Sequence, residues 1–459
     1  MNLSSFRLRE RYAELFQLDP GNKKIYFVGG VVRDLVLGRQ NSDIDLLCDF
    51  DTRSIARRLA EIRKGAFYVL DETRNTCRVI VSAGGVKQVY DFARQQGHTL
   101  LNDLTGRDFT INAMAIAFDD PDELIDPLHS LEDIDRKVLR ACSPASFTAD
   151  PVRVIRAVRY AVSYQLDIEP GTQTLLLASV DALAKISGER KRDEFYKILA
   201  TADPLAGIKL LQQYGILPEL GLSTVTDHEV KVASILVNLL QVIEGQPCTA
   251  NDEFGHILPA PLARYFRKYA EILCRKNSSE RSLHQLLILC AILGPLDSQA
   301  IRRVAEKLVL SNEEMQRLIL YRDQSDLVLR MFERLDFLTD RDLYLFFAKT
   351  GPAGLDLCLL TLAQFRAVAQ ETRFESFLIF STKIFETWFG RPELVHPIPL
   401  LNGNDLMMQF DLTPGPMIGR LIEDLKEEQA AGQIKNRSQA LDWAEERINQ
   451  LKAEERWKK

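Results

Sequence analysis

Hydrophobic positions follow two different spacings along the chain, and the change between them falls near residue 150. Before that point, short β-rich runs alternate with segments whose apolar residues recur every three to four positions, as on one face of a helix. After Asp150 the helical spacing continues with only short breaks. The pattern predicts an α+β fold, with an N-terminal mixed β-sheet and its helices followed by an all-α remainder.

The same pattern predicts the individual elements of the N-terminal part. Strands are expected at residues 24–28, 44–48, 66–70, 77–81 and 86–92. Helices are expected at residues 31–37, where Gly38 ends the helix, and at residues 52–64. The last two strands flank Gly84-Gly85, which favours a β-hairpin.

Proline and glycine mark the breaks in the helical remainder. Such breaks occur at Glu169-Pro-Gly171, at Leu217-Pro218 and in the segment 395–416 (VHPIPLLNGNDLMMQFDLTPGP). We therefore expect four domains: a head at residues 1–140, a helical neck at 141–220, a helical body at 221–392 and a helical tail at 393–459.

Composition narrows the class of protein. With 459 residues, 46% hydrophobic and 27% charged, the chain is typical of a soluble globular protein with several domains. Its longest apolar run, 286–296 (LLILCAILGPL), is too short to span a bilayer. The N-terminus MNLSSFRLRERYAELF is charged where a signal peptide is apolar, and the seven cysteines form no CxxC pair. We expect a cytoplasmic protein with no membrane partner.

The charge distribution leaves two readings of one segment open. The formal net charge of −6 argues against indiscriminate nucleic-acid binding, and we expect no DNA partner. Residues 264–281 (RYFRKYAEILCRKNSSER) nevertheless hold six Lys or Arg against two Glu, with aromatic residues interleaved. This segment is either a stripe that meets a phosphate backbone or the solvated face of a helix.

Two carboxylates are predicted to stand side by side on one strand. Side chains at i and i+2 of a strand share a face, so Asp43 and Asp45 point one way while Ile44 points into the core. Carboxylates placed in this way can hold Mg²⁺ for phosphoryl transfer. Asp91, which has apolar neighbours on a later strand, is the candidate third carboxylate. The alternative is that Asp43 and Asp45 merely end a strand at the surface.

The glycines upstream suggest a phosphate site. Gly29-Gly30 follows a strand and opens a helix, so its bare backbone N–H groups can approach a phosphate at a helix N-terminus. The stretch is neither GxGxxG nor a Walker A loop, which disfavours the Rossmann and P-loop readings. Arg33 either reaches the same phosphate or forms a salt bridge with Asp34.

A second group of charges opens the helical part. Asp150-Pro151 is a typical helix start, with Asp as N-cap and Pro at the first helical position. Arg153, Arg156 and Arg159 follow at i, i+3 and i+6, which places three cations on one side of a helix otherwise rich in Val, Ile and Ala. Solubility alone explains this arrangement poorly.

Taken in order, these motifs resemble a known family. GGVVRD followed by DIDL looks like the nucleotidyltransferase head of the DNA polymerase β superfamily. Five further segments make the chain similar to the bacterial class II tRNA nucleotidyltransferase/poly(A) polymerase family: GRDFTINA at 106–113, Asp126-Pro127, DPVRVIRAVR at 150–159, GERKRDE at 188–194 and LLNGNDL with PGPMIG at 400–419. The resemblance spans nearly the whole chain and implies that tRNA binds at the tail.

The resemblance implies a role for each candidate residue. Gly29, Gly30 and Arg33 would cradle a triphosphate, Asp43 and Asp45 would hold Mg²⁺, and Arg107, Asp108 and Asn112 would meet the phosphates and ribose. Asp150 and Arg153 would hydrogen-bond the Watson–Crick edge of the incoming base, with Arg156 and Arg159 in support.

Three departures from the family pattern bear on specificity. Gly106 stands where relatives have an arginine, and Ala149 where they have an acidic residue. Only twelve residues separate Arg94 from Arg107, whereas CCA-adding relatives carry a longer flexible loop there, so the chain resembles the CC-adding subgroup. No His-Asp pair follows the neck and His228 is isolated, so we expect an inert helical body rather than an HD phosphohydrolase domain.

The resulting expectation is an enzyme that adds C and/or A to the 3′ end of tRNA without a template, from CTP and/or ATP, with CC addition favoured. In this reaction the tRNA 3′-hydroxyl attacks the nucleotide α-phosphate in line. The alternatives are a poly(A) polymerase and a catalytically idle RNA-binding protein. A small-molecule nucleotidyltransferase would not need so long a helical extension.

Overall fold

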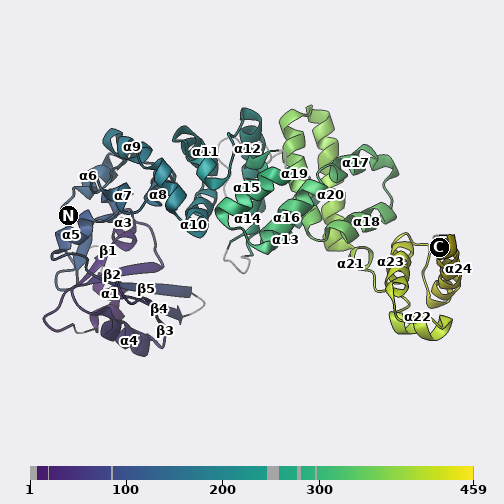
Figure 1. Ribbon diagram of the computed structural model, residues 1–459, viewed down its shortest axis with the longest axis horizontal. Coiled ribbons are helices and arrows are strands. Elements are labelled where there is room, and N and C mark those ends of the chain that lie inside the picture. Colours follow the sequence, from purple (N-terminus) through teal and green to yellow (C-terminus); the bar gives the residue numbers. More distant parts are fainter. Residues whose placement is uncertain are drawn as a thin grey trace. The chain divides into compact units, whose positions relative to one another are not determined.

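The chain divides into two compact units, Met1–Glu219 and Leu220–Lys459. The computed structural model describes residues 8–18, 20–83, 86–245, 258–275, 281–294 and 297–457, and Figure 1 shows them as ribbons. The finer division into head, neck, body and tail stays a prediction. The two units are described separately below.

A mixed seven-stranded sheet forms the centre of the first unit, in the order β3-β4-β5-β2-β1-β6-β7. Only β2 and β5 pair in parallel, and the other neighbours are antiparallel. The strands are β1 Ile25–Val28, β2 Asp43–Cys48, β3 Ala66–Asp71, β4 Thr76–Ala83, β5 Val86–Arg94, β6 Ala115–Ala117 and β7 Leu124–Ile125. The predicted hairpin is confirmed by the pairing of β4 with β5, although Gly84-Gly85 lies outside the described residues.

Helices and short 3₁₀ turns complete the first unit. They are α1 Leu8–Arg11, α2 Ala13–Phe16, α3 Gly30–Val36, α4 Thr52–Arg63, α5 Leu100–Thr105, η2 Thr110–Asn112, α6 Ser130–Asp135, α7 Ser146–Ala149, α8 Arg153–Tyr164, α9 Pro170–Leu177, η3 Val180–Lys185, α10 Gly188–Leu199, α11 Pro204–Gln213 and η4 Leu217–Leu220, the last of which reaches the second unit. A small parallel pair, β8 Val138–Leu139 and β9 Asp167–Ile168, joins the segment before α7 to the end of α8.

The two faces of the large sheet are covered differently. On one face, α1, α2 and α4 pack against a continuous apolar core that includes Ile44, Val79 and Phe92. On the other face, a smaller cluster covers only β1, β6 and the ends of β2 and β5, where Leu104 of α5 contributes. Because side chains alternate along a strand, Asp43 and Asp45 lie on this second face, next to Leu47.

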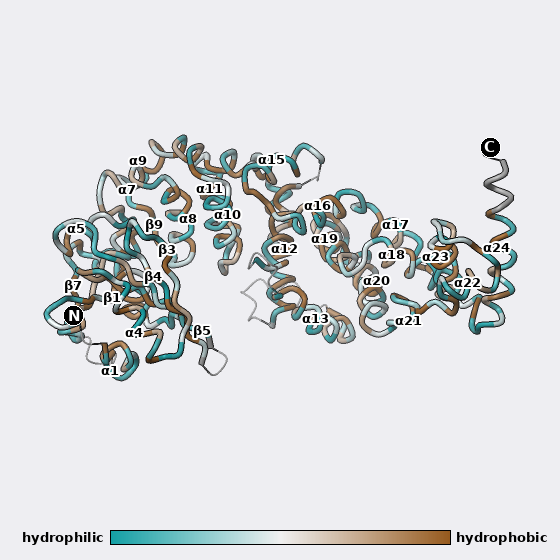
Figure 2. The backbone as a smooth tube through the Cα atoms, turned by 60° about the horizontal axis from the view of Figure 1, so that its bottom comes forward, coloured by the Kyte–Doolittle hydropathy of each residue, from teal (hydrophilic) through white to brown (hydrophobic). Residues whose placement is uncertain are grey.

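The second unit is all helical in its described part, which confirms the predicted fold class. Its elements are α12 Asp227–Ile243, α13 Ala260–Leu273, α14 Leu283–Leu293, α15 Ser298–Leu308, α16 Asn312–Asp323, α17 Leu327–Glu333, η5 Leu335–Phe337, α18 Asp340–Thr350, α19 Ala353–Val368, α20 Glu371–Gly390, α21 Pro392–Val395, α22 Gly403–Phe410, α23 Pro416–Ala430 and α24 Arg437–Trp457. Hydrophilic and hydrophobic residues share most of these helices (Figure 2), as expected where each helix buries one face.

Two sequence features of this unit have a structural explanation. The apolar run that begins at Leu286 lies in α14, whose side chains are almost all buried, so it is a core helix as predicted. The aromatic residues of the basic segment, Tyr265, Phe266 and Tyr269, are buried on α13. They belong to the core and are not available to stack on RNA, while residues 276–280 of that segment lie outside the described part. No single described helix is long and apolar enough to cross a membrane; α18 and α19 pass that test only as a pair bent by 103°.

Candidate active site

Three aspartates meet on the partly covered face of the sheet. Asp43 and Asp45 both point to this face, because Ile44 and Leu46 between and beside them are buried in the opposite core. The parallel register sets Asp45 directly opposite Asp91 of β5. Asp91 is not a free carboxylate: Nε and Nη2 of Arg78 on β4 donate to its two oxygens at 2.8 Å each.

The pKa of the Asp45 carboxylate is set by burial and by neighbouring charges of both signs. Burial raises the pKa of Asp45 to about 6, the guanidinium of Arg107 opposes this rise, and the charges of Asp91 and Asp43 add to it. Among the residues described, no three His, Cys, Asp or Glu side chains converge closely enough to hold a metal ion. Asp43 and Asp45 therefore supply two hard oxygen ligands, which suit a divalent cation completed by other donors.

The turn between β1 and α3 requires glycine. Gly29 has φ 70°, in the left-handed region, and a Cβ there would lie 3.0 Å from Nη1 of Arg107 and 3.2 Å from Oδ2 of Asp45. The backbone N–H of Gly30 donates to the Asp45 carboxylate. The turn thus brings backbone, guanidinium and carboxylate together.

Arg33 is buried and already paired. Its Nε donates to Asp34 at 2.9 Å, its Nη1 donates to the side chain of Asn112, and its guanidinium lies 4.4 Å from the ring centre of Tyr164. The salt bridge with Asp34 forms, while contact of Arg33 with a phosphate stays a prediction. Asn41, a residue that the motif analysis did not single out, donates to the other oxygen of Asp34 at 2.7 Å.

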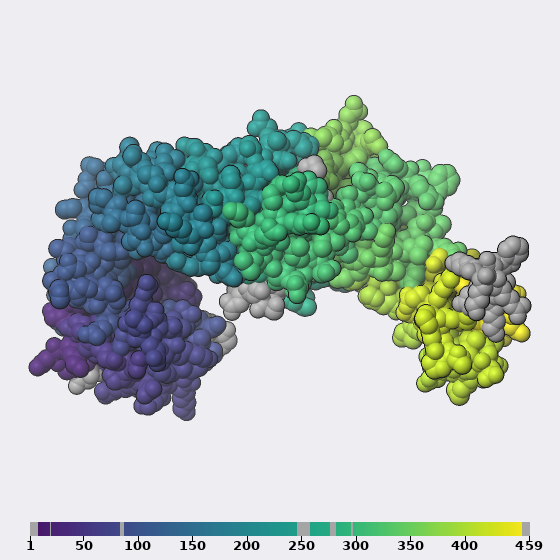
Figure 3. Space-filling view, viewed as in Figure 1, coloured from purple at the N-terminus to yellow at the C-terminus, as the bar shows by residue number. Residues whose placement is uncertain are grey.

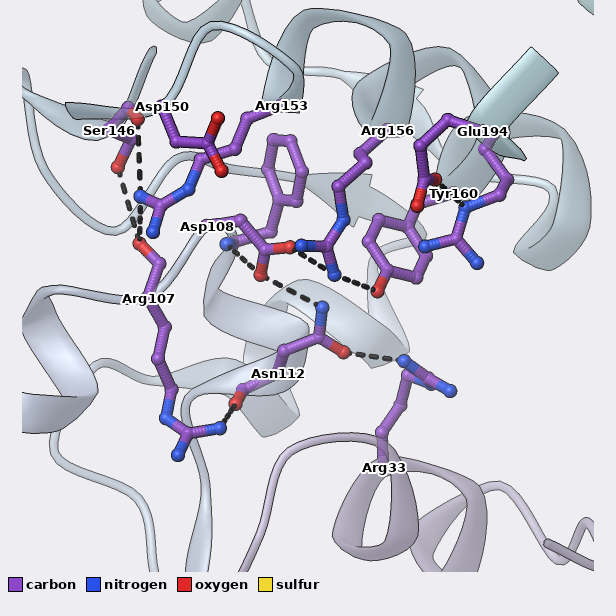
Figure 4. Close-up of polar contacts among 12 residues, drawn as sticks. Arg33, Arg107, Asp108, Asn112, Ser146, Asp150, Arg153, Arg156, Tyr160 and Glu194 are labelled. Atoms are coloured by element: carbon purple, nitrogen blue, oxygen red, sulfur yellow. Dashed lines mark hydrogen bonds and ion pairs between the residues drawn. The ribbon is translucent and has the colours of Figure 1, made fainter. Parts of the chain in front are cut away.

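Arg107 and Asp108 have opposite surroundings, although they are neighbours. Arg107 is held by Asp103 of α5 at 3.2 Å and extends toward Asp45. Asp108 is buried; although burial acts to raise its pKa, the guanidinium of Arg156 at 2.9 Å and the amide of Asn112 hold the pKa below its ordinary value. Asp108 thus ties η2 to α8 in this structure (Figure 4), rather than pointing to open space.

The helix after Asp150 begins later than the sequence suggested. α8 starts at Arg153, because Asp150 and Pro151 form a preceding turn in which Asp150 accepts from the N–H of Val152 at 3.3 Å. The carboxylate of Asp150 pairs with Arg190 of α10 at 2.7 Å. The observed helix start therefore lies two residues after the predicted one: Val152 is the N-cap, and Asp150 begins the preceding turn.

The three arginines of α8 meet different partners. Arg153 donates to the carbonyl oxygens of Gly106, Arg107 and Ser146 at 2.9–3.1 Å. Arg156 pairs with Asp108 and donates to the hydroxyl of Tyr160 at 3.0 Å, and Arg159 pairs with Glu194 of α10 at 2.7 Å. Figure 4 shows Arg153 directed toward the backbone of Arg107 and Arg156 directed toward Asp108.

A cavity of about 330 Å³ brings most of the candidate residues together. It lies between the sheet and α8, and Figure 3 shows the surface of this unit hollowed between the purple and blue residues of the sheet and the teal helices. Its lining residues are Gly29, Gly30, Arg33, Asn41, Asp43, Asp45, Arg107, Asp108, Asn112, Arg153, Arg156, Arg159 and Tyr160. Asp91 and Asp150 are not among them.

The sequence analysis missed several residues that support this cavity. Asn41 and Tyr160 line it, while Arg190 and Glu194 hold Asp150 and Arg159 from α10. Arg190 and Glu194 stand in the GERKRDE segment, so that motif was a signal for them. Asn41 and Tyr160 have no such signal, because their neighbours in space come from other elements.

A larger cavity, of about 540 Å³, lies in the second unit and is mostly apolar. His228 and Glu229 of α12 stand at it together with Tyr321, Cys290 and Phe365. It contains no cluster of metal ligands among the residues described. The carboxylates and arginines make the cavity of the first unit the candidate active site.

The segment expected to be a short loop contains a helix. Between Arg94 and Arg107 lies α5, whose N-terminus carries a capping box formed by Thr99 and Asn102. Gly106 is the C-cap of this helix, and its carbonyl oxygen accepts from Arg153. Half of the twelve-residue segment is therefore regular structure fixed to α8.

Three family models match the chain. Residues 25–140 match the poly A polymerase head domain, residues 165–221 match a segment described as a probable RNA and SrmB-binding site of polymerase A, and residues 356–444 match domain 2 of tRNA nucleotidyltransferases. The first match covers the sheet and its carboxylates, and the third covers α20 to α23.

Individual proteins resemble the chain over nearly its full length. The CC-adding tRNA nucleotidyltransferase of Geobacter sulfurreducens is 30% identical over 430 residues, which cover 90% of each chain. The A-adding tRNA nucleotidyltransferase of Deinococcus radiodurans is 29% identical, covering 91% of this chain and 95% of that one. In the solved structures, the Thermotoga maritima CCA-adding enzyme in complex with tRNA has the same fold, with a TM-score of 0.64, 22% identity and coverage of 98% of this chain and 99% of that chain.

Proposed function

Because the chain belongs to the tRNA nucleotidyltransferase family and is therefore an enzyme of that class, we propose that its candidate active site adds nucleotides from CTP and/or ATP to the 3′ end of tRNA. One observation carries the proposal: Asp43 and Asp45 share a single cavity with Arg107, Arg156 and Arg159. Carboxylates for a metal ion and cations for a triphosphate are the two requirements of phosphoryl transfer.

The carboxylates fit a divalent cation, and we propose Mg²⁺. Asp43 and Asp45 offer oxygen ligands on one face of β2, and because burial raises the pKa of Asp45, a bound cation would favour its ionised form. When bound, the ion would lower the pKa of the attacking hydroxyl and neutralise charge on the phosphates. Asn41 accepts from the N–H of Asp43 at 2.8 Å and so fixes the start of this strand.

The arginine side of the cavity suits the triphosphate. Arg107 extends from α5 toward Asp45, and Gly29 leaves the space that a side chain would fill. In the proposed reaction the tRNA 3′-hydroxyl oxygen forms a new bond to the α-phosphorus, the bond between the α-phosphorus and its bridging oxygen breaks, and pyrophosphate leaves with its charge facing these arginines. The hydroxyl proton passes to solvent. Positioning and fixed charges supply most of the rate enhancement in such sites.

Base recognition would require an exchange of partners. The family resemblance assigns the Watson–Crick edge of the base to Asp150 and Arg153. Here Asp150 pairs with Arg190, and Arg153 donates to three backbone carbonyl oxygens. An incoming base would replace these contacts with hydrogen bonds of the same kind, so the free enzyme keeps both side chains satisfied until a nucleotide arrives.

We propose CC as the product. The segment from 95 to 106 is short and half helical, and Arg153 fixes its end to α8. Little free chain remains to shift the Asp150/Arg153 pair from a cytosine-matched to an adenine-matched geometry. Similar proteins include both CC-adding and A-adding tRNA nucleotidyltransferases, so the product must be measured.

The test uses purified full-length protein and three acceptors: tRNA lacking CCA, the same tRNA ending in CC, and an unrelated RNA. Each acceptor is incubated with Mg²⁺ and labelled CTP, labelled ATP or both, and the 3′ ends are sequenced. The expected result is CC on the first acceptor and little addition to the others. CCA on the first acceptor refutes the CC product but keeps the family activity, and long A tracts on the unrelated RNA indicate a poly(A) polymerase. No incorporation on any acceptor refutes the proposed function.

A further inference from the structure

A row of side chains crosses the sheet from the candidate active site to its edge. The strand registers set Asp45 opposite Asp91, Asp91 opposite Arg78, and Arg78 opposite Tyr68 of the edge strand β3. Directly opposite residues in a sheet point to the same face. With strands about 4.8 Å apart, the row from Asp45 to Tyr68 is about 14 Å long.

The outer part of this face, over β3, β4 and β5, lies beyond the apolar cluster that covers β1 and β6. We call it the open face. We define it by the residues that share the side of Asp91 on β3, β4 and β5, namely Tyr68, Arg78, Ile80, Lys87, Val89 and Asp91. Tyr68 is 50% exposed, the Arg78 side chain is 40% exposed, and Lys87 is exposed. The apolar cluster with α5 ends at Leu47 and Ala93, one step before Asp45 and Asp91.

The chemistry of the open face matches a single-stranded nucleic acid. A solvent-exposed aromatic ring gives a base a surface on which to stack, and cations beside it meet the phosphates. Arg78 donates from Nε and Nη2 to Asp91, so its Nη1 takes no part in that pair, and the side chain is 40% exposed. Lys87 adds a second positive charge, and Ile80 and Val89 between them give an apolar floor.

The position of the open face relative to Asp45 indicates which substrate it would contact. In the sheet, β2 stands between β1 and β5, so the Gly29 turn with Arg107 lies on one side of Asp45 and the open face lies on the other. In-line displacement places the attacking oxygen and the leaving pyrophosphate on opposite sides of the phosphorus. If the triphosphate occupies the arginine side, the attacking 3′-hydroxyl must arrive from the side of β5.

We propose that the open face binds the unpaired 3′-terminal nucleotides of the acceptor RNA, with Tyr68 stacking on a base and Arg78 and Lys87 contacting its phosphates. This inference rests on the proposed function and adds the location of the acceptor end. Tyr68 is the best residue for testing RNA binding against a purely structural role. Half of its surface is exposed to solvent, so it contributes little to the core.

The test measures binding without added metal, so that no chemistry occurs. The full-length protein is titrated with two RNAs: a tRNA with two unpaired 3′ nucleotides, and the same tRNA trimmed to its last base pair. The wild type is expected to bind the untrimmed tRNA about 10-fold more tightly, given the usual contribution of stacking. Tyr68→Ala should reduce this ratio to within about 2-fold, Lys87→Ala should reduce it partly, and Tyr68→Phe, which keeps the ring, should preserve it.

Ile62 provides the matched control. It is 40% exposed on α4, which covers the opposite face, so Ile62→Ala should leave the ratio unchanged. A ratio near one for the wild type, or a full ratio for Tyr68→Ala, overturns the inference.

A kinetic arm separates this inference from the proposed function. Tyr68→Ala should raise KM for tRNA about 10-fold and leave KM for CTP unchanged. A rise in KM for CTP instead would place the nucleotide on the open face and overturn the inference. If the wild type incorporates no nucleotide at all, the proposed function fails. If the wild type incorporates nucleotides but the variants bind tRNA as tightly as it does, only the proposed binding of RNA to the open face is refuted.

Discussion

At the scale of single residues, the candidate active site depends on two carboxylates and one glycine. Three carboxylates line the cavity: Asp108 pairs with Arg156, whereas Asp43 and Asp45 form no ion pair with any cation in the described part of the chain. Gly29 keeps the backbone close enough to bring Arg107 and Asp45 within reach of one ligand. In the proposed function, the two carboxylates would hold the metal ion and Gly29 would leave room for the phosphates.

Asp45→Asn should reduce the rate of nucleotide incorporation at least about 100-fold, because it deletes an ionised metal ligand that contributes several kcal/mol to transition-state stabilisation. Binding of tRNA should change less than about 2-fold, since the carboxylate faces the metal ion rather than the RNA. Single-turnover incorporation and a tRNA titration on the same preparation measure both. Turnover above a few per cent of wild type with ample Mg²⁺ would contradict the two-carboxylate site.

Gly29→Ala should lower both stability and activity. The left-handed backbone costs a non-glycine residue about 1–2 kcal/mol, and the new methyl group would press on Arg107 and Asp45. Gly38→Ala is the matched control, because Gly38 also has a left-handed φ of 66° but nothing within 4 Å of its Cβ position. Both variants should lose similar stability in thermal unfolding, and only Gly29→Ala should lose activity; equal activity in both would refute the steric argument.

At the scale of elements, α8 and α10 together present the side chains assigned to the base. Arg159 of α8 pairs with Glu194, and Asp150 in the turn before α8 pairs with Arg190, so α10 contacts both the helix and that turn. α5 is joined to the same helix through the contacts of Arg153 with the carbonyl oxygens of Gly106 and Arg107. In the proposed function, nucleotide selection would thus depend on three elements rather than on one motif.

Arg190→Ala should alter nucleotide preference without unfolding the protein. The Arg190–Asp150 pair is half exposed, and such pairs contribute at most about 1 kcal/mol to stability. Without its partner, Asp150 should be less well positioned, and the ratio of kcat/KM for CTP to that for ATP should change about 3- to 10-fold. Arg136→Ala removes a comparable exposed pair with Glu132 and should change neither quantity. An unaltered CTP/ATP ratio in Arg190→Ala would remove Asp150 from base selection.

At the scale of the whole molecule, buried charge pairs occur in both units. In the second unit, Arg281 donates to both carboxylate oxygens of Glu314 at 2.7 Å, and both residues are buried. Although burial acts to raise it, these bonds and those from Ser311 lower the pKa of Glu314 to about 2. Acid should therefore weaken the second unit through this pair.

The sign of the effect follows from the lowered pKa. Above the ordinary pKa of about 4.5 the pair contributes its full stability, and the contribution is lost as pH falls from there through about 2. Glu314→Gln should cost about 3 kcal/mol at pH 7, because it leaves Arg281 buried without its charge partner. The difference in Tm from wild type should shrink at pH 3. Glu313→Gln, at the exposed neighbouring position, should have little effect on Tm at either pH. If the Tm difference between Glu314→Gln and wild type stays constant with pH, the stabilising role of the Arg281–Glu314 pair is contradicted.

Local patterns in the sequence determined the fold class and the centre of the site. The alternation around Ile44 places Asp43 and Asp45 on one face of a strand, and Gly29-Gly30 reads as a turn before a helix, because both depend only on backbone geometry over a few residues. The five predicted strands and the two predicted helices of the N-terminal part follow for the same reason. The all-α remainder likewise follows from apolar residues that recur every three to four positions.

Only the tertiary structure decided which charges remain available. Arg153 donates to carbonyl oxygens, Asp108 is buried against Arg156, and Asp91 is held by Arg78, and none of these pairings is encoded near those residues in the sequence. Long cationic side chains can reach several partners, so their choice depends on how elements far apart in the chain pack together. The row from Asp45 to Tyr68 exists for the same reason: strand order and register, which no local pattern specifies, bring four distant residues onto one face.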